Sequence, residues 1–400
     1  MIVDRLNLTD FRNYASADVG FAEGANLIVG SNGQGKTNLV EALGYLSTLG
    51  SHRVSTDHAM IRQGSDAAIV RAQLRHDERR MLVELQLNRA AANRAQVNRS
   101  PIKVRELPRY FSSVLFAPED LALIRGEPSG RRRFLDELLV LRSPRLTGVF
   151  ADYDRVLRQR NSLLKSARSS GVKEQQLTTL DIWDERLVVL GAEIIVARAD
   201  LVGALLPEVQ AAYISVAGDD HHAELTNSLS IFGGGSEPGE DTGGRVDDSA
   251  MAAAELLTIV EAEVAFRTRL AAIRRSELER GVTLVGPHRD DLILGLNGMP
   301  ARGYASHGES WSFALSLKLA SAELLRRESS LGDPVLILDD VFAELDEHRR
   351  SRLAEAVDGF SQVLITDAVF DEVPRELAGN TVYIAAGTVV AAPEQLDGTG

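Results

Sequence analysis

The stretch NLIVGSNGQGKTNLVEAL, residues 26–43, decides the fold class. Residues 26–29 form a β-branched, apolar run that predicts a buried strand, and residues 36–49 predict an amphipathic helix. The segment between them has the spacing G-x-x-x-x-G-K-T. Strand, Gly-rich loop and helix start follow in the order that a phosphate-binding loop requires, so the sequence predicts an α/β nucleotide-binding fold.

The loop suits phosphate because its backbone N–H groups and the positive helix end point at the anion. Lys36 is expected to reach the β- and γ-phosphate oxygens, and the Thr37 hydroxyl to coordinate Mg²⁺. The glycines let the backbone approach the ligand closely. The predicted ATP-binding residues of this loop are Gly30, Ser31, Asn32, Gly33, Gln34, Gly35, Lys36 and Thr37.

A second motif, PVLILDDVFAELD at 334–346, ends an apolar strand in two carboxylates. Asp339 is predicted to hold Mg²⁺ or its water, and Asp340 to polarise the water that attacks the γ-phosphate. A loop cap is the alternative. The motif follows Thr37 by 302 residues, which indicates a large insertion between two halves of one nucleotide-binding core.

A third motif lies at 304–325, YASHGESWSFALSLKLASAELL. Ser306, Gly308 and Glu309 offer a hydroxyl, N–H groups and a helix start, which would make a second anion-binding end. A chain with one phosphate loop needs such an end only if it caps the γ-phosphate of a partner subunit. The alternative is an ordinary capping box, because Ser306 and Glu309 are three residues apart.

Composition narrows the class of protein. The 400 residues predict two or three domains, and the chain has no cysteine, which fits a reducing cytoplasm. The sequence contains no apolar run long enough to predict a membrane span. Its first residues lack the basic and apolar layout of a signal peptide. Residues 1–170 contain 26 Lys and Arg against 18 Asp and Glu, whereas residues 171–400 contain 18 against 39. This asymmetry is compatible with a nucleic-acid surface on one part, or with uneven surface composition alone.

The chain is predicted to divide into a head, residues 1–130 with 281–400, and an inserted helical arm, residues 131–280, with a flexible loop at 233–249. Two long helices are expected in the arm. Either they form a short coiled coil, or they are the core of a helical domain. The first has a heptad seam from Trp183 to Ala204; the second covers 249–280, with an inner face of Leu256, Val260, Val264 and Ala271.

In the head, the segments 67–74 and 79–87 alternate between apolar and polar residues, which predicts an antiparallel hairpin. After the arm, strands are expected again, followed by a helix and a closing hairpin. The expected strands are 281–286, 290–298, 334–340 and 362–367, the helix is 311–328, and the hairpin is 380–392.

Taken in order, these motifs resemble the RecF family of DNA replication and repair proteins. The likeness is carried by LNLTDFRNY, GSNGQGKT, LFAPEDLALIRGEPSGRRRFLD, GPHRDDL, the stretch 306–309 and ILDDVFAELD, from residue 2 to about 390. The resemblance implies an ATPase head of the ABC/SMC superfamily type.

The resemblance also implies roles for further residues. Arg12 and Asn13 lie where such heads contact the nucleotide, and Arg53 where they place an arginine for the γ-phosphate. The stretch 306–309 matches the signature motif that acts in trans across an ATP sandwich, and Asp346 matches the dimer-facing loop. Arg53 could instead be a surface ion-pair partner, and Asp346 a helix cap.

Some positions depart from the family pattern. Glu309 replaces the usual signature glutamine, and Trp311 follows where a small polar or basic residue is expected. Thr366 and Asp367 occupy the place of the switch histidine. Glu119 or Asp120 would have to substitute for the Q-loop glutamine.

The function implied by the resemblance is that of a cytoplasmic, weak, DNA-stimulated ATPase. It would act in recombinational repair, replication and the SOS response to DNA damage. ATP and Mg²⁺ would close a homodimer on gapped or double-stranded DNA and slow hydrolysis would release it, so that RecO and RecR can help place RecA on single strands.

Two other classes stay open: an SMC-like chromosome-organising ATPase and the ATPase subunit of a transporter. The DNA contacts are also open. The run Arg131, Arg132 and Arg133 is a candidate for phosphate contacts, but it could equally be a helix start folded onto acidic neighbours.

Overall fold

The computed structural model describes residues 1–170, 178–218, 221–234, 257–329 and 331–391. It contains two compact units. The first comprises Met1–Leu121, Ala211–Asp220 and Trp311–Gly400, and the second Ala122–Gln210 and His221–Ser310. The units divide at 121/122 and 310/311, whereas the boundaries expected from the sequence were 130/131 and 280/281. Those domain boundaries stay a prediction.

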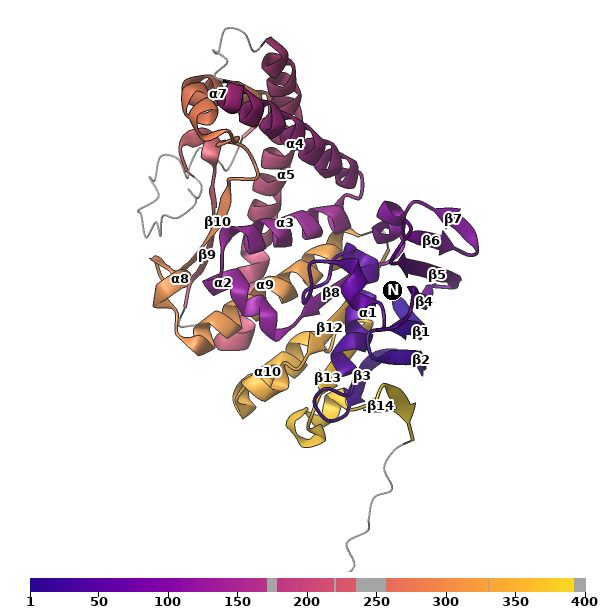
Figure 1. Ribbon diagram of the computed structural model, residues 1–400. Helices are drawn as coiled ribbons and strands as arrows, with labels where there is room; N and C mark the ends of the chain where they lie inside the picture. Colours follow the sequence, from indigo (N-terminus) through magenta and orange to yellow (C-terminus); the bar gives the residue numbers. More distant parts are fainter. Residues whose placement is uncertain (171–177, 219–220, 235–256, 330, 392–400) are drawn as a thin grey trace, which may run out of the picture. The chain divides into compact units, whose positions relative to one another are not determined.

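A mixed, mostly parallel sheet forms the centre of the first unit (Figure 1). Neighbouring strands of this sheet run parallel, except that β14 and β15, at one edge, are antiparallel. Near-continuous apolar runs such as VLILD suit strands that are covered on both faces. In sheet order the strands are β15 (Thr388–Val390), β14 (Asn380–Ala385), β3 (Gly24–Val29), β13 (Gln362–Asp367), β12 (Val335–Asp339) and β8 (Ser113–Phe116).

An antiparallel sheet forms the second layer of this unit. Its strands alternate between buried and exposed side chains, as expected for a sheet with one face on the core. In sheet order they are β2 (Tyr14–Gly20), β1 (Ile2–Phe11), β4 (Ala67–His76), β5 (Arg79–Asn88), β6 (Arg94–Val97) and β7 (Ser100–Ile102). The pairing of β4 with β5 confirms the predicted hairpin.

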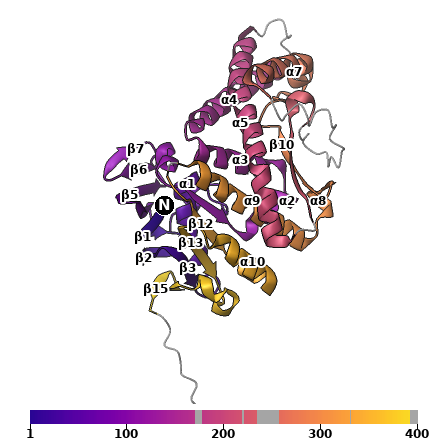
Figure 2. The same ribbon diagram turned by 180° about the vertical axis from the view of Figure 1, so that it is seen from behind.

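Helix α1 (Lys36–Thr48) lies between the two sheets (Figures 1 and 2). Its buried Leu39, Val40, Leu43 and Leu46 belong to one hydrophobic cluster with side chains of both sheets. The helix ends at Leu49, which adopts the left-handed conformation at φ 57°, one residue before the glycine expected to stop it. The phosphate loop is therefore held at its helical end by a packed core.

The first unit also contains α10 (Glu347–Val357) and several short 3-10 turns. Helix α9 (His307–Glu328) has most of its residues in this unit and begins four residues earlier than expected. The turns in this unit are η1 (Asp57–Met60), η2 (Val104–Arg109), η3 (Pro118–Asp120), η6 (Phe342–Glu344), η7 (Phe370–Glu372) and η8 (Arg375–Leu377).

The second unit is mainly helical, with a three-stranded sheet in the order β11-β10-β9. Its core gathers Tyr153, Leu187, Ile194 and Phe266 from three helices. The helices are α2 (Leu121–Arg125), α3 (Pro128–Arg142), α4 (Leu146–Ser170), α5 (Thr178–Ala217), α7 (Ile259–Arg280) and α8 (Ala301–Tyr304). The last part of α5, from Ala211, belongs to the first unit. The other elements are β9 (Ala223–Ser228), η5 (Ser230–Phe232), β10 (Asp291–Leu296) and β11 (Met299–Pro300). None of the helices among the described residues is long and apolar enough to cross a bilayer.

The expected strands at 26–29, 290–298, 334–340 and 362–367 and the closing hairpin are confirmed. The expected strand at 281–286 is wrong: that segment is a series of turns. Its polar groups bond to α4 instead of to a neighbouring strand, because Thr283 accepts from Arg160 Nη1 at 2.8 Å and donates to Asn161 Oδ1 at 2.7 Å.

The inner face expected for the second arm helix is also wrong. Val260 and Val264 are 70% and 57% exposed, and α7 instead buries Ala262, Phe266 and Leu270. Leu256, most of the loop 233–249 and the chain end after 391 lie outside the described residues. The seam of α5 does bury Leu187, Ile194 and Leu201. Because Leu187 and Ile194 pack in a multi-helix core, this favours the helical-domain alternative over a free coiled coil.

Candidate nucleotide-binding site

The phosphate loop requires glycine at Gly35 for its backbone conformation and at Gly30 for lack of space. Gly35 has φ +120°, and a Cβ there would lie 2.8 Å from the Tyr14 hydroxyl. A Cβ on Gly30 would lie 2.3 Å from the carbonyl oxygen of Ile384 on β14. Lys36 is buried and its ammonium donates to the Gly30 carbonyl at 2.7 Å. The loop is therefore wrapped closely around its own lysine.

The second motif meets the loop at the edge of the parallel sheet. The Thr37 hydroxyl donates to Asp339 Oδ1 at 3.1 Å, although the two residues are 302 positions apart. Hydroxyl and carboxylate oxygens are ligands that Mg²⁺ accepts, so the pair fits this ion. No group of three or more His, Cys, Asp or Glu that could hold a metal occurs among the described residues.

The two carboxylates differ in their surroundings. Burial raises the pKa of Asp339 to about 6, and the neighbouring Asp340 adds to the rise, while the Thr366 hydroxyl opposes it by hydrogen bonding. Burial also raises the pKa of Asp340, whereas Lys36 lowers it. A bound divalent cation would offset the cost of keeping both anionic.

Asp340 has an unusual backbone conformation. Its φ is +50°, in the left-handed region that non-glycine residues seldom occupy. The residue is held there because its N–H donates to the carbonyl and the hydroxyl of Thr366, both at 3.1 Å. Thr366, at the place expected for the switch histidine, thus bonds the carboxylate of Asp339 and the backbone of Asp340. Its neighbour Asp367 is buried, and its Oδ2 has no hydrogen-bond partner.

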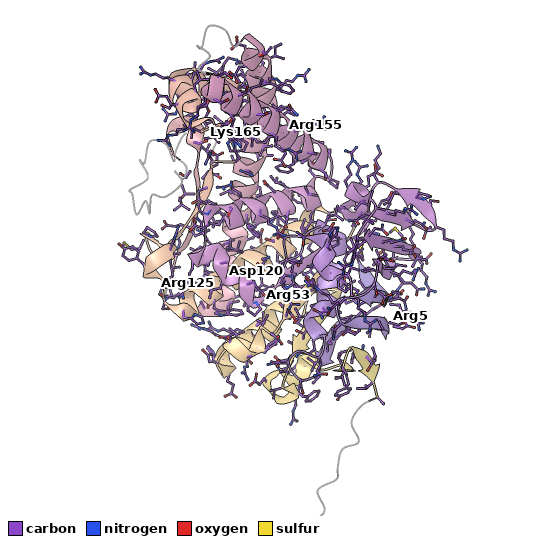
Figure 3. The ribbon with its side chains drawn as sticks, viewed as in Figure 1. Arg5, Arg53, Asp120, Arg125, Arg155 and Lys165 are labelled. Atoms are coloured by element: carbon purple, nitrogen blue, oxygen red, sulfur yellow. The ribbon has the colours of Figure 1, made fainter. Side chains whose placement is uncertain are left out.

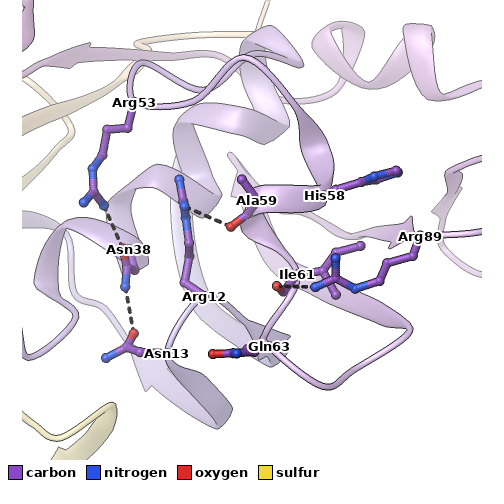
Figure 4. Close-up of a pocket in the computed structure, with 9 residues that line it drawn as sticks. All are labelled: Arg12, Asn13, Asn38, Arg53, His58, Ala59, Ile61, Gln63 and Arg89. Atoms are coloured by element: carbon purple, nitrogen blue, oxygen red, sulfur yellow. Dashed lines mark hydrogen bonds between the residues drawn. The ribbon is translucent and has the colours of Figure 1, made fainter.

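A pocket of about 480 Å³ opens beside the loop (Figure 4). Arg12, Asn13 and Arg53, the residues implied by the family resemblance, all line it. The sequence did not single out the rest of the wall. Those additional lining residues are Asn38, His58, Ala59, Ile61, Gln63 and Arg89.

A chain of amide hydrogen bonds joins the pocket to the phosphate loop (Figure 4). Arg53 Nη1 donates to Asn38 Oδ1 at 2.8 Å, and Asn38 Nδ2 donates to Asn13 Oδ1 at 2.8 Å. Asn13 Nδ2 in turn donates to the Gln34 carbonyl at 2.9 Å. Arg53 is therefore linked to the loop through two amide side chains.

Arg12 is held differently, by a carboxylate that the sequence analysis missed. Its guanidinium grips Glu41 of α1 with two nitrogens, one of them Nε at 2.7 Å, and donates to the Ala59 carbonyl at 2.9 Å. Glu41 is 1% exposed. The signal was available, because Glu41 is the only acidic residue in an otherwise apolar helix segment that follows the loop.

The signature-like stretch forms the start of α9. The Ser306 N–H donates to Glu309 Oε2 at 2.7 Å and the Glu309 N–H donates to the Ser306 hydroxyl at 3.3 Å. This is the capping box that was left open as an alternative. Both residues remain partly exposed, as does Gly308, so the cap does not remove them from reach of a ligand.

The other departures from the family pattern have defined positions within the first unit. Trp311 is buried and stacks edge-on against Phe116 at 4.9 Å between ring centroids. Asp120 pairs with Lys318 at 2.9 Å, whereas Glu119 contributes to the electrostatics of both Asp339 and Asp340. Of the two Q-loop candidates, Glu119 is thus the one whose charge contributes to the raised pKa of both carboxylates. Asp346 caps α10 and is 61% exposed at its side chain.

The three arginines proposed for DNA differ from one another. Arg131 is 5% exposed and bonds bidentately to Asp291 at 2.8 Å, so it is not available to a DNA backbone. Arg132 donates to the Asp290 carbonyl at 2.7 Å. Arg133 is half exposed and pairs with Glu137 on the same helix. For Arg131 the candidate DNA role is corrected to the alternative, a helix start folded onto an acidic neighbour.

Other basic side chains of the second unit do reach solvent. Arg155 and Lys165 project from α4 (Figure 3). The Arg155 side chain is 66% exposed and pairs only locally with Asp152, three residues earlier. Exposed cations of this kind fit phosphate contacts better than Arg131 does.

Comparisons with known proteins identify the family of the chain. A family profile described as the RecF/RecN/SMC N terminal domain matches residues 2–379. A protein of Clavibacter michiganensis subsp. michiganensis (strain NCPPB 382), named DNA replication and repair protein RecF, is 65% identical over 398 residues, which cover 98% of this chain and 96% of that protein.

Two solved structures are also similar. A structure described as the recombination mediator protein RecF with ATPrS in the RecFOR pathway has a TM-score of 0.83 at 29% identity, covering 97% of each chain. An Smc head bound to the C-winged helix domain of ScpA has a TM-score of 0.52 at 14% identity, covering 99% of this chain and 98% of that one. The second likeness concerns the fold alone, which is that of an ABC/SMC-type ATPase head.

Proposed function

The chain belongs to the RecF family, and on that premise we propose that it is an ATP-dependent DNA-binding protein of recombinational repair and replication. ATP and Mg²⁺ drive two copies together on double-stranded or gapped DNA, and slow hydrolysis releases them. In this role the protein helps RecO and RecR to load RecA on single strands.

One observation carries the nucleotide part of the proposal. Thr37 of the loop and Asp339 of the distant strand are hydrogen bonded at 3.1 Å, so two segments 302 residues apart build one site. Mg²⁺ held there would neutralise charge on the β- and γ-phosphates. Thr37 and Asp339 would hold the ion, and Lys36 would contact the phosphates.

Hydrolysis is assigned to Asp340. Its carboxylate follows Asp339 at the strand end, and its backbone is fixed by Thr366. A fixed carboxylate can accept a proton from a water poised for in-line attack. We expect Asp340→Asn to retain binding of a slowly hydrolysed ATP analogue and to slow single-turnover hydrolysis by about 10²–10⁴-fold. Unchanged hydrolysis would transfer the role to another group.

The dimer part rests on the helix start at Ser306–Glu309. It offers a hydroxyl and N–H groups at the positive end of the 22-residue helix α9. Acting in trans, Ser306 would contact the γ-phosphate bound to the other copy, with Gly308, Glu309 and Asp346 at the shared face. Each composite site would then need residues from both copies.

The test combines sizing with DNA binding, using a slowly hydrolysed ATP analogue and Mg²⁺ on gapped and blunt duplexes. We expect dimers and tight DNA binding only with the analogue, and neither with Lys36→Ala. The proposal fails if the protein stays monomeric at high concentration with nucleotide and Mg²⁺ while it hydrolyses ATP at full rate. It also fails if Lys36→Ala binds ATP as tightly as the native protein.

A further inference from the structure

Glu41 is a buried carboxylate of the candidate site to which no role in phosphate or Mg²⁺ binding has been given. Glu41 lies on α1, five residues after the lysine of the loop, and is 1% exposed. Its oxygens accept two hydrogen bonds from Arg12 and one from the Ser51 hydroxyl, and Arg53 Nη1 lies 3.9 Å away. Glu41 therefore touches both arginines that the site offers to a nucleotide.

Ser51 extends this contact to the turn that carries Arg53. While its hydroxyl donates to Glu41, its oxygen accepts from the N–H groups of Arg53 at 3.0 Å and Val54 at 3.1 Å. The turn after α1 is thus tied to the helix through one side chain. The Arg53 guanidinium, which is 37% exposed, can still reach a ligand.

Glu41 is charged in this environment. Burial would raise the pKa of the carboxyl, but the hydrogen bonds from Arg12 and Ser51 outweigh it and hold the pKa below its ordinary value. A buried anion is tolerated only when it is paired and hydrogen bonded. Here the pairing groups are two cations of the pocket wall.

Because Glu41 is negatively charged, it cannot strengthen triphosphate binding by direct electrostatic attraction. An anion beside a phosphate-binding loop opposes binding of the triphosphate. Its benefit must therefore be geometric: it holds two long, flexible side chains in place before the ligand arrives. Such preorganisation reduces the entropy lost on binding.

We propose that Glu41 is a positioning residue that orients Arg12 and Arg53 for the nucleotide triphosphate and links the two through Ser51. The inference rests on the proposed function, because it requires the pocket of Figure 4 to hold part of the nucleotide. Glu41 itself touches no reacting atom.

Glu41→Gln keeps the length of the side chain and removes its charge. The measurement is the ratio of affinities for a slowly hydrolysed ATP analogue and for ADP. Loss of an anion alone would favour the ligand with more negative charge and raise this ratio. Loss of arginine positioning is expected to lower it about 10-fold, the scale of one charged hydrogen bond.

The decisive comparison makes Glu41→Gln both in the native protein and in the Arg53→Ala variant. If Glu41 acts partly through Arg53, Glu41→Gln should lower the ratio much less in Arg53→Ala than in the native protein. Glu84→Gln is the matched control, since Glu84 pairs with Arg71 in the antiparallel sheet outside the pocket. It should leave the ratio unchanged. If Glu41→Gln does not fold, Ser51→Ala cuts the same link without removing the charge, and should lower the ratio by a smaller factor.

The outcomes separate the two proposals. If Lys36→Ala abolishes binding while Glu41→Gln leaves or raises the ratio, or lowers it equally in both backgrounds, the inference about Glu41 is overturned and the proposed function stands. If Lys36→Ala binds the analogue normally, the proposed function itself fails.

Discussion

Single residues in this protein show how burial, more than residue type, decides what a charged side chain does. Arg131 and Arg133 are two positions apart in one basic run, yet one is buried against Asp291 and the other is half exposed. The sequence could name the run but could not separate its members, because the partner of Arg131 lies 160 residues away.

A stability measurement would show this difference. Arg131→Ala leaves Asp291 buried without its partner, so we expect a loss of about 3–5 kcal/mol in the free energy of unfolding. Arg133→Ala removes a surface pair and should cost at most about 0.5 kcal/mol. Urea unfolding of both variants checks the prediction. Equal losses would contradict the assignment of Arg131 as a structural residue.

Asp290 gives a second prediction, for the dependence of stability on pH. Burial raises its pKa to about 6 even though Ser230 donates two hydrogen bonds to it. The folded state therefore binds a proton between about pH 4 and 6 that the unfolded state has lost, and this group destabilises the protein as pH rises through that window. The shift corresponds to about 3 kcal/mol.

Asp290→Asn removes that penalty and should be stabilising relative to the native protein at pH 7 but not at pH 4. The neighbouring His288 acts in the opposite direction, since burial lowers its pKa to about 3. The difference between variant and native protein, measured by unfolding at both pH values, isolates Asp290. A difference that does not change with pH would refute the shift.

At the scale of elements, the sequence predicted most strands and the phosphate-loop helix, because each has a clear period and end signals. It misplaced the face of α7. That helix carries apolar residues on two faces, and local pattern cannot tell which face meets α4 and α5. The buried face is set by Phe266, whose ring occupies the space beside Gly191 and Gly286.

A matched pair of substitutions tests this face. Phe266→Ala should lower the free energy of unfolding by about 3–5 kcal/mol, because the ring is fully buried against two glycines. Val264→Ala, two residues earlier and 57% exposed, should change it by less than about 0.5 kcal/mol. If Val264→Ala were the more damaging change, the face expected from the sequence would be restored.

The candidate site was predictable where chemistry follows a local motif. The phosphate-loop motif predicted Lys36 and Thr37, and the end of an apolar strand predicted Asp339 and Asp340. The structure brings the two motifs together. Glu41 was not predicted. Its position as a lone acidic residue in an apolar helix segment was visible in the sequence, but its partners lie in the segments around 12 and 51–53, and no local pattern reveals those contacts.

At the scale of the whole molecule, the proposed dimer makes a mixing experiment informative. Lys36→Ala disables the loop of one copy, and Ser306→Arg blocks the signature of the other. Each variant alone should be inactive. In a mixed dimer, the native loop of one copy faces the native signature of its partner, so mixing should restore part of the ATP hydrolysis. No recovery in a demonstrated mixed dimer would argue against action in trans.

The order of the central sheet has a consequence for how the protein is made. β3 pairs only with β13 and β14, so its neighbours lie more than 330 residues further along the chain. At about 5–20 residues per second, a ribosome leaves this strand without partners for roughly 20–70 s. During translation, both edges of β3 in the nascent chain remain unpaired. A truncated mRNA that lacks the codons for β13 and β14 therefore cannot produce a complete nucleotide-binding site.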